Sequence, residues 1–218
     1  MALTRPDSVI ALELHGGKPL SPLVNAGAIA TTSLINAENA EQRWQRILHI
    51  QQQLAGEQVA LSDEVNQSEQ TTNFHNRAIA WLLYSAGYLY CDAMEACDVY
   101  TRQCSTLINT VELATLGATL AAGGVNPLTH KRVLQADNVP YILAEMMMEG
   151  LYGRSGDWAY RVGLPGKSGV GGGILAVVPG VMGIAAFSPP LDEEGNSVRG
   201  QKMVASVAKQ LGYNVFKG

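Results

Sequence analysis

Charged residues are scarce in this chain, and no part of it is strongly basic. Only 16% of the 218 residues are charged, and the formal net charge is −4. Lysine and arginine do not cluster with aromatic residues, so binding to a phosphate backbone has little electrostatic support. Nucleic acid is therefore not an expected partner.

Cysteine is also rare, and its pattern excludes two common structural uses. The three residues, Cys91, Cys97 and Cys104, are odd in number and contain no Cys-x-x-Cys pair. This arrangement fits neither a disulfide framework nor a zinc ribbon, and it predicts reduced thiols. Cys97 and Cys104 are seven residues apart, so they would share one buried helical face. No histidine recurs at i, i+4 with an acid between, and no metal site is predicted.

Long hydrophobic runs are limited to residues 169–187, which carry no charge. That length alone would permit a membrane span. However, six glycines and Pro179 interrupt the run, so residues 174–178 and 181–187 are interpreted as two buried strands around a Pro179-Gly180 turn. The N-terminus lacks the pattern of a secretory signal. We therefore expect no membrane insertion and a cytoplasmic location.

Apolar periodicity predicts a chain that is helical first and contains strands later. A short extended segment is expected at residues 8–14, and Asp63 is expected to cap a helix. Three consecutive methionines, residues 146–148, are interpreted as core residues. Helices are predicted over residues 25–34, 38–55, 76–86, 92–105, 110–122, 139–149 and 197–211. Helices beside an antiparallel sheet indicate an α+β architecture.

Five motifs occur in order along the chain. They are residues 22–28 (PLVNAGA), 68–76 (SEQTTNFHN), 98–105 (DVYTRQCS), 150–152 (GLY) and 163–170 (GLPGKSGV). Together they resemble the bacterial serine-dependent glutaminase family, which is related to the β-lactamase/transpeptidase fold. The resemblance extends from about residue 8 to the end of the chain.

The resemblance implies a fold, a substrate and an assembly. The fold would be a single domain over residues 1–218, β-lactamase/transpeptidase-like, with a helical lobe at about 24–150 and a sheet with a C-terminal helix at about 157–218. The complete enzyme would hydrolyse L-glutamine to L-glutamate and ammonia through an acyl-serine intermediate. No cofactor would be needed, and a cytoplasmic homotetramer would be expected.

The resemblance also assigns the substrate pocket. Its residues would be Asn25, Glu69, Asn76, Tyr100, Tyr152 and Val170. Glu69 would face the substrate ammonium, Tyr152 would relay protons, and the backbone N–H of Val170 would be the oxyanion donor. Taken singly, each has an ordinary alternative: a surface acid for Glu69, caps or turns for the asparagines, and packing for the tyrosines.

One part of the family pattern is missing. The family places a Ser-x-x-Lys pair, which supplies the nucleophile and its base, upstream of the Asn25 motif, where this sequence has none. The pair Ser206/Lys209 lies on the predicted C-terminal helix and is expected to be solvated. We therefore expect an N-terminally truncated member, with impaired turnover and an unpaired sheet edge.

Two competing functions remain. Lys167-Ser-Gly alone would permit another penicillin-recognising acyl-serine hydrolase, but Glu69 together with Asn76 argues against it. The other possibility is an inactive remnant or pseudo-subunit that binds glutamine or full-length partners without turnover.

Overall fold

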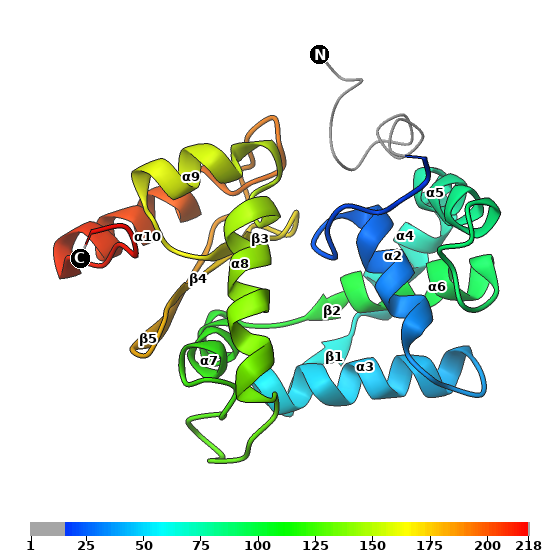
Figure 1. Ribbon diagram of the computed structural model, residues 1–218, viewed down its shortest axis with the longest axis horizontal. Helices are drawn as coiled ribbons and strands as arrows, with labels where there is room; N and C mark the ends of the chain where they lie inside the picture. The colour runs from blue at the N-terminus through cyan, green and yellow to red at the C-terminus, as the bar shows by residue number, and fades with distance from the viewer. Residues whose placement is uncertain (1–15, 218) are drawn as a thin grey trace. The chain divides into compact units, whose positions relative to one another are not determined.

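The computed structural model describes residues 16–217, and the chain forms two compact units. The first unit comprises the chain up to Ile50 together with Val59–Leu107, and the second comprises Gln51–Gln58 together with the chain from Ile108 onward. Figure 1 labels the α-helices and β-strands of both. The extended segment predicted at residues 8–14 lies outside the described residues, and the single domain over residues 1–218 stays a prediction.

The first unit consists mainly of helices. Its elements are α2 (Asn25–Leu34), α3 (Ala40–Ala55, whose end belongs to the second unit), β1 (Ala60–Leu61), α4 (Asp63–Thr72), α5 (Phe74–Ser85), α6 (Ala93–Cys104) and β2 (Thr106–Leu107). The short strands β1 and β2 pair in antiparallel fashion. Ser62, rather than the predicted Asp63, caps α4, because the Ser62 hydroxyl accepts a hydrogen bond from the Val65 N–H at 3.3 Å.

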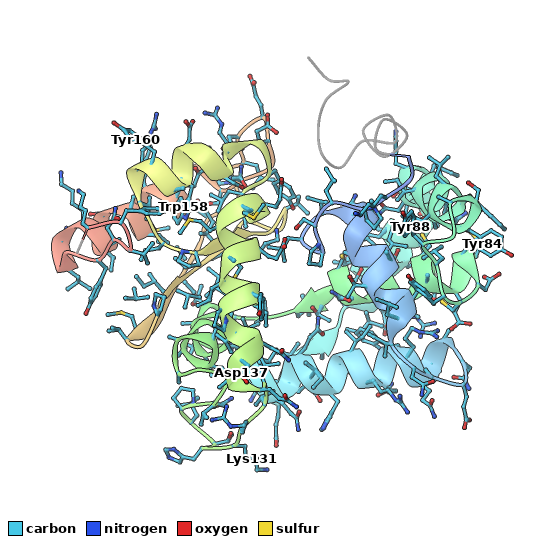
Figure 2. The ribbon with its side chains drawn as sticks, viewed as in Figure 1. Tyr84, Tyr88, Lys131, Asp137, Trp158 and Tyr160 are labelled. Atoms are coloured by element: carbon cyan, nitrogen blue, oxygen red, sulfur yellow. The ribbon has the colours of Figure 1, made fainter. Side chains whose placement is uncertain are left out.

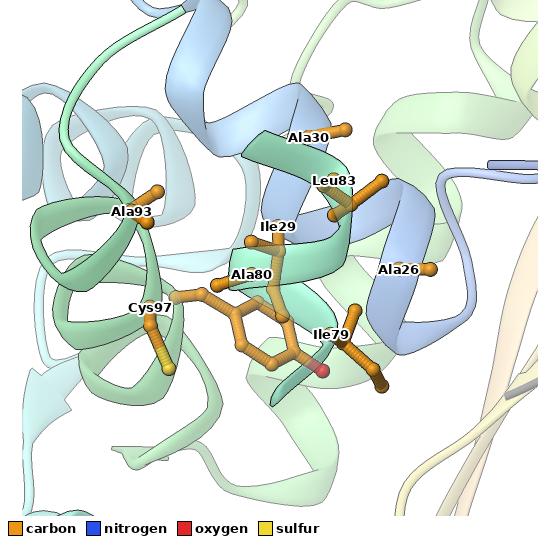
Figure 3. Close-up of a cluster of buried hydrophobic side chains, with 10 residues drawn as sticks. Ala26, Ile29, Ala30, Ile79, Ala80, Leu83, Ala93 and Cys97 are labelled. Atoms are coloured by element: carbon orange, nitrogen blue, oxygen red, sulfur yellow. The ribbon is translucent and has the colours of Figure 1, made fainter. Parts of the chain in front are cut away.

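An apolar core joins α2, α5 and α6 (Figure 3). It is formed by Ala26, Ile29, Ala30, Ile79, Ala80, Leu83, Ala93, Ala96, Cys97 and Tyr100. These residues recur at helical spacing, so each helix turns one apolar face inward. Cys97 is buried as predicted, but Cys104 is exposed. The prediction for Cys104 was wrong because this last residue of α6 lies beyond the end of the core.

The second unit combines helices with a three-stranded sheet. Its elements are α7 (Thr110–Ala121), η2 (Ala136–Asn138), α8 (Val139–Glu149), η3 (Tyr152–Arg154), α9 (Ser155–Arg161), β3 (Gly166–Ser168), β4 (Gly173–Val178), β5 (Met182–Phe187) and α10 (Val198–Leu211). The strand order is β3-β4-β5, and both pairings are antiparallel. The predicted hairpin is confirmed, and Gly180 adopts the positive φ of 75° that its turn requires.

Strand β4 lies in the middle of the sheet and is buried on both faces. Ile174, Ala176 and Val178 pack with Trp158 of α9 and with residues of α10. In Figure 2, Trp158 is turned towards the sheet, whereas Tyr160 of the same helix is 89% exposed. Helix α7 covers the opposite face, since Gly117 of α7 closely approaches β4 and β5. The fold is therefore α+β, as predicted.

The consecutive methionines of α8 do not share one environment. Met146 is buried, but Met148 is 67% exposed. Two residues along a helix correspond to a rotation of about 200°, so neighbours in sequence cannot all face one core. The prediction of a core role therefore holds for Met146 and is wrong for Met148.

The uncharged run of residues 169–187 forms a loop and the β4-β5 hairpin. None of the helices within residues 16–217 has both the length and the apolar character that crossing a membrane would require. In the described part of the chain, β3 and β5 are the outer strands of the three-stranded sheet.

Candidate active site

Three helices of the first unit bring together Asn25, Asn76 and Tyr100. The Asn25 Nδ2 group donates a hydrogen bond to Asn76 Oδ1 at 2.9 Å. The Tyr100 hydroxyl donates to Asn25 Oδ1, also at 2.9 Å. These three polar side chains therefore form a hydrogen-bonded set, which we call the amide triplet.

The amide triplet has no role in capping the helices that carry it. Asn25 is the first residue of α2, yet neither α2 nor α5 has a side-chain cap hydrogen bond. Tyr100 is only 8% exposed, while Asn25 and Asn76 are half-buried. The ordinary interpretation of the asparagines as caps is wrong, because their amides bond to each other across helices.

Glu69 lies on α4 and is exposed. Within the described residues, its carboxylate makes no hydrogen bond or ion pair, and this includes the residues of the amide triplet. A carboxylate without a bonding partner is available to a cationic group of a ligand.

The second unit places Tyr152 next to Lys167. Tyr152 has a φ of 53°, a left-handed conformation that costs a non-glycine residue about 1 to 2 kcal/mol. Ser155 holds this turn, since its hydroxyl donates to the Tyr152 carbonyl at 2.9 Å and accepts from the Leu151 N–H at 3.0 Å. The Lys167 ammonium lies 4.6 Å from the centre of the Tyr152 ring. These contacts therefore hold the Tyr152 backbone in a strained conformation and place its ring beside the Lys167 ammonium.

Val170 lies in the loop between β3 and β4 and is 69% exposed. The loop is closed by the Gly169 N–H, which donates to the Gly173 carbonyl, and by the Gly172 N–H, which donates to the Gly169 carbonyl, both at 2.9 Å. Within the described residues, the Val170 N–H has no hydrogen-bond partner. It is thus a backbone donor on a closed loop.

Asn196 is a structural residue of this region to which the sequence assigned no role. It is fully buried, its Oδ1 accepts from the Ser168 hydroxyl at 2.5 Å, and its Nδ2 donates to the Leu151 carbonyl at 3.2 Å. One amide therefore ties strand β3 to the turn that carries Tyr152. These partners are 28 and 45 residues away from Asn196 in the sequence, so no local pattern indicates them.

Asp192 organises the loop that carries Asn196. Its Oδ1 accepts from the Asn196 N–H at 2.9 Å and the Glu194 N–H at 3.0 Å, and its Oδ2 accepts from Gln201 Nε2 at 3.0 Å. Partial burial acts to raise the pKa of Asp192, but these hydrogen bonds, with help from the charge of Arg154, outweigh it and lower the pKa below 3.8.

We expect this pKa shift to make stability depend on pH. The ionised form of Asp192 is favoured in the folded state, so its contribution is complete above about pH 3.8 and is lost as the pH falls through the lower folded pKa. Urea unfolding of the wild type and of Asp192→Asn at pH 6 and pH 3 measures the effect. The stability difference between them should shrink at pH 3, and a difference independent of pH would contradict the assignment.

The Ser206/Lys209 pair has the surface position expected from the sequence. Both residues are exposed on α10, while Val204 and Ala208 of that helix are buried. The Ser206 hydroxyl accepts a hydrogen bond from Gln210 Nε2 at 3.1 Å.

Across residues 16–217, His, Cys, Asp and Glu form no group of three that could hold a metal ion.

These features define an α+β protein that has a hydrogen-bonded set of two amides and a phenol in one unit and a strained tyrosine beside a lysine in the other. Its sequence matches the pattern of the glutaminase family over residues 4–216. Glutaminase 1 of Escherichia coli O6:H1 is 99% identical over 212 residues, which cover 97% of this chain and 68% of that protein. The glutaminase of Desulfovibrio desulfuricans is 72% identical over 211 residues. The chain belongs to the glutaminase family, whose members are hydrolases.

Solved structures agree with this assignment. A probable glutaminase with 97% identity has a TM-score of 0.97, and the match covers 98% of this chain and 69% of that one. A Bacillus subtilis glutaminase has 33% identity and a TM-score of 0.87, over 91% of this chain and 70% of that one. That structure is a covalent complex with 5-oxo-L-norleucine, formed by reaction with 6-diazo-5-oxo-L-norleucine.

Proposed function

We propose that this chain binds L-glutamine and carries the substrate-binding and oxyanion-stabilising parts of a glutaminase. The observation that carries the proposal is the amide triplet, in which hydrogen bonds span 51 and 75 residues of sequence. Amides and a phenol orient a polar ligand without adding charge. The 5-oxo-L-norleucine bound covalently by the Bacillus subtilis relative repeats the five carbons of glutamine and has a sixth carbon in place of the amide nitrogen.

The first unit would recognise the amino acid. Glutamine is a zwitterion with a neutral side-chain amide, so its ammonium requires a carboxylate, and we assign this role to Glu69. Asn25, Asn76 and Tyr100 would orient the ligand through their amide and hydroxyl groups. The unpartnered carboxylate of Glu69 and the preorganised triplet support these roles.

The second unit would supply two groups for the chemical step. We assign proton relay to the Tyr152 hydroxyl and stabilisation of the oxyanion to the Val170 N–H. The support for Val170 is an unpartnered donor on a closed loop. The support for Tyr152 is its strained backbone beside the Lys167 cation, since strain of this kind is concentrated at functional sites.

The reaction would proceed in two acyl-transfer steps. A serine oxygen attacks the side-chain carbonyl carbon and its proton passes to the leaving nitrogen, which departs as ammonia; water then hydrolyses the ester to L-glutamate. The sequence contains no Ser-x-x-Lys pair before Asn25, and Ser206 is a surface residue. We therefore propose that turnover needs a serine and a lysine other than Ser206 and Lys209.

Calorimetry with L-glutamine, combined with an assay for ammonia, tests this function. We expect saturable binding, ammonia release that is the same in the wild type and in Ser206→Ala, and no adduct at Ser206 after treatment with 6-diazo-5-oxo-L-norleucine. Absence of glutamine binding would contradict the proposed function. Turnover that is lost in Ser206→Ala would contradict our placement of the nucleophile.

A second candidate function is that of a pseudo-subunit that binds glutamine or full-length partners without hydrolysing glutamine. Glutamine binding with no ammonia release would support this candidate. A β-lactam serves as the control for another penicillin-recognising hydrolase, because a thermal shift with the β-lactam and none with glutamine would reverse the choice of substrate.

Family membership also supports three wider proposals. We propose that the sheet and helices form part of a β-lactamase/transpeptidase-like fold, that the protein is cytoplasmic, and that it assembles as a homotetramer. Sedimentation equilibrium of the purified chain measures the assembly directly.

A further inference from the structure

Helix α4 carries Glu69 but buries none of its side chains. Helices α2, α5 and α6 of the same unit each bury several apolar residues in the shared core. Most helical stability in proteins comes from packing an apolar face, which α4 does not provide. Other contacts must therefore hold this helix in place.

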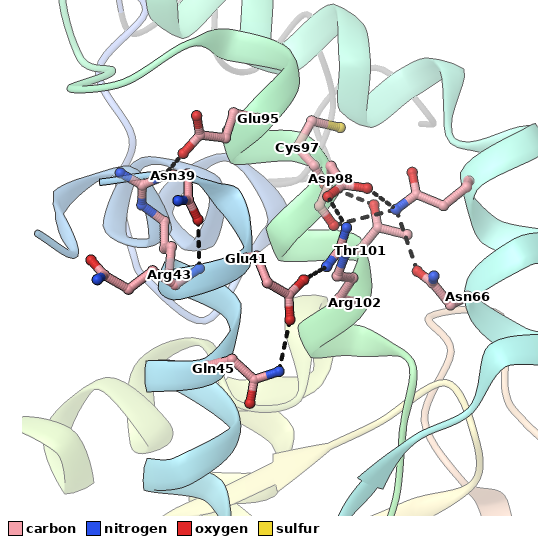
Figure 4. A network of polar contacts seen from close by, with 12 residues as sticks. Asn39, Glu41, Arg43, Gln45, Asn66, Glu95, Cys97, Asp98, Thr101 and Arg102 are labelled. Atoms are coloured by element: carbon pink, nitrogen blue, oxygen red, sulfur yellow. Dashed lines mark hydrogen bonds and ion pairs between the residues drawn. The ribbon is translucent and has the colours of Figure 1, made fainter. Parts of the chain in front are cut away.

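Polar contacts between α4 and α6 supply this attachment (Figure 4). Gln70 Nε2 donates to Asp98 Oδ1 at 2.7 Å and lies 3.3 Å from the Asp98 carbonyl oxygen. Asn73, where α4 meets α5, is 7% exposed, and its Nδ2 donates to Thr101 Oγ1 at 2.9 Å. We call these two contacts the α4 clamp.

The acceptors of the α4 clamp are themselves fixed. Asp98 forms an ion pair with Arg102 at 3.1 Å, and Arg102 also pairs with Glu41 of α3 at 2.7 Å. The Thr101 hydroxyl donates to the Cys97 carbonyl at 2.8 Å. Hydrogen bonds to a charged acceptor are stronger than neutral ones, so Gln70 is held against a rigid partner.

The clamp also connects the proposed ligand contacts. Gln70 is adjacent to Glu69 in sequence, while Asp98 and Thr101 lie on either side of Tyr100. The Asn73 N–H donates to the Glu69 carbonyl at 2.9 Å. The same contacts that fasten α4 therefore determine where Glu69 lies with respect to the amide triplet.

We propose that Gln70 and Asn73 are positioning residues for Glu69 and set the selectivity of the protein for ligands with an α-ammonium group. The inference rests on the proposed function, because it assumes that Glu69 faces the ammonium of glutamine. Neither residue needs to touch the ligand. Their contribution is to hold a carboxylate at a fixed place on a helix that has no apolar anchor.

Two ligands distinguish the positioning of Glu69 from a general effect of the substitutions on folding. L-Glutamine carries the α-ammonium, whereas glutaramic acid has the same carboxylate and amide but lacks the amino group. Loss of positioning should weaken binding of glutamine alone, because glutaramic acid makes no use of Glu69. A merely structural role would weaken both ligands together.

The experiment is calorimetry of the full chain and of Gln70→Ala with each ligand. We expect glutamine affinity to fall about tenfold, equivalent to about 1.4 kcal/mol, and glutaramic acid affinity to change less than about twofold. Gln67→Ala is the matched control, since Gln67 is exposed on the same helix, and it should leave both affinities unchanged. Thr101→Val, which removes the acceptor of Asn73 at constant size, should reproduce the selective loss even if Gln70→Ala does not fold.

The outcomes distinguish failure of the proposed function from failure of the positioning role alone. If the wild type does not bind glutamine, the proposed function fails and this inference fails with it. If the wild type binds glutamine but the clamp variants weaken both ligands equally, or neither, then the positioning role alone is overturned.

Discussion

Replacing Glu69 by glutamine should weaken binding of L-glutamine by about 10- to 150-fold. A charge-assisted hydrogen bond contributes about 1.5 to 3 kcal/mol, and each 1.4 kcal/mol is a tenfold change in affinity. The substitution keeps the size of the side chain and removes only the charge opposite the ammonium. Isothermal titration of both proteins with L-glutamine measures the change.

Helix α4 provides a matched control for this experiment. Glu64 is exposed on the same helix, so Glu64→Gln makes the identical chemical change away from the proposed ligand contact. We expect its glutamine affinity to be close to that of the wild type. Equal losses in the two variants would mean that the net charge of α4 matters rather than Glu69, and no loss in Glu69→Gln would remove Glu69 from the site.

Replacing Gly183 by alanine should lower the free energy of unfolding by about 3 kcal/mol, at the upper end of the usual cost of overpacking. A β-carbon at this position would lie 2.4 Å from the Ala114 carbonyl oxygen and 2.5 Å from the Ala118 nitrogen. Both atoms are backbone atoms of α7, so no side-chain rotation can make room. The helix would have to move away from the sheet.

Gly156→Ala is the control for this second prediction. Gly156 lies in α9 of the same unit, and an added β-carbon would have no neighbour within 4 Å. Alanine favours helices over glycine by about 1 kcal/mol, so this variant should be as stable as the wild type or slightly more stable. Chemical unfolding monitored by circular dichroism compares the three proteins, and equal stabilities of Gly183→Ala and Gly156→Ala would contradict the packing argument.

Local patterns in the sequence predicted several of the elements next to the candidate site. The helix expected at residues 139–149 has those bounds in the structure, and the two strands around Pro179-Gly180 are present. Both depended on signals a few residues long, namely apolar periodicity and turn residues. The capping of α4 was missed by one residue, since Ser and Asp are both favourable caps and stand next to each other at Ser62 and Asp63.

Burial was harder to predict than secondary structure. Cys104 and Met148 each lie on a helix that was expected, but both are exposed. A helical pattern predicts which residues share one face of the helix. It does not predict where along the helix axis the neighbouring element ends. This depends on segments that are distant in sequence.

The sequence by itself determined seven of the helices, the β4-β5 hairpin and, through motifs spread over the whole chain, membership of the glutaminase family. Only the tertiary structure decided that Asn25, Asn76 and Tyr100 bond to one another, that Asn196 ties Ser168 to Leu151, and that Gln70 fastens α4 to Asp98. The physical reason is that helix and strand formation depends on neighbours in sequence, whereas these hydrogen bonds join atoms between 28 and 75 residues apart and exist only after the helices and the sheet have packed.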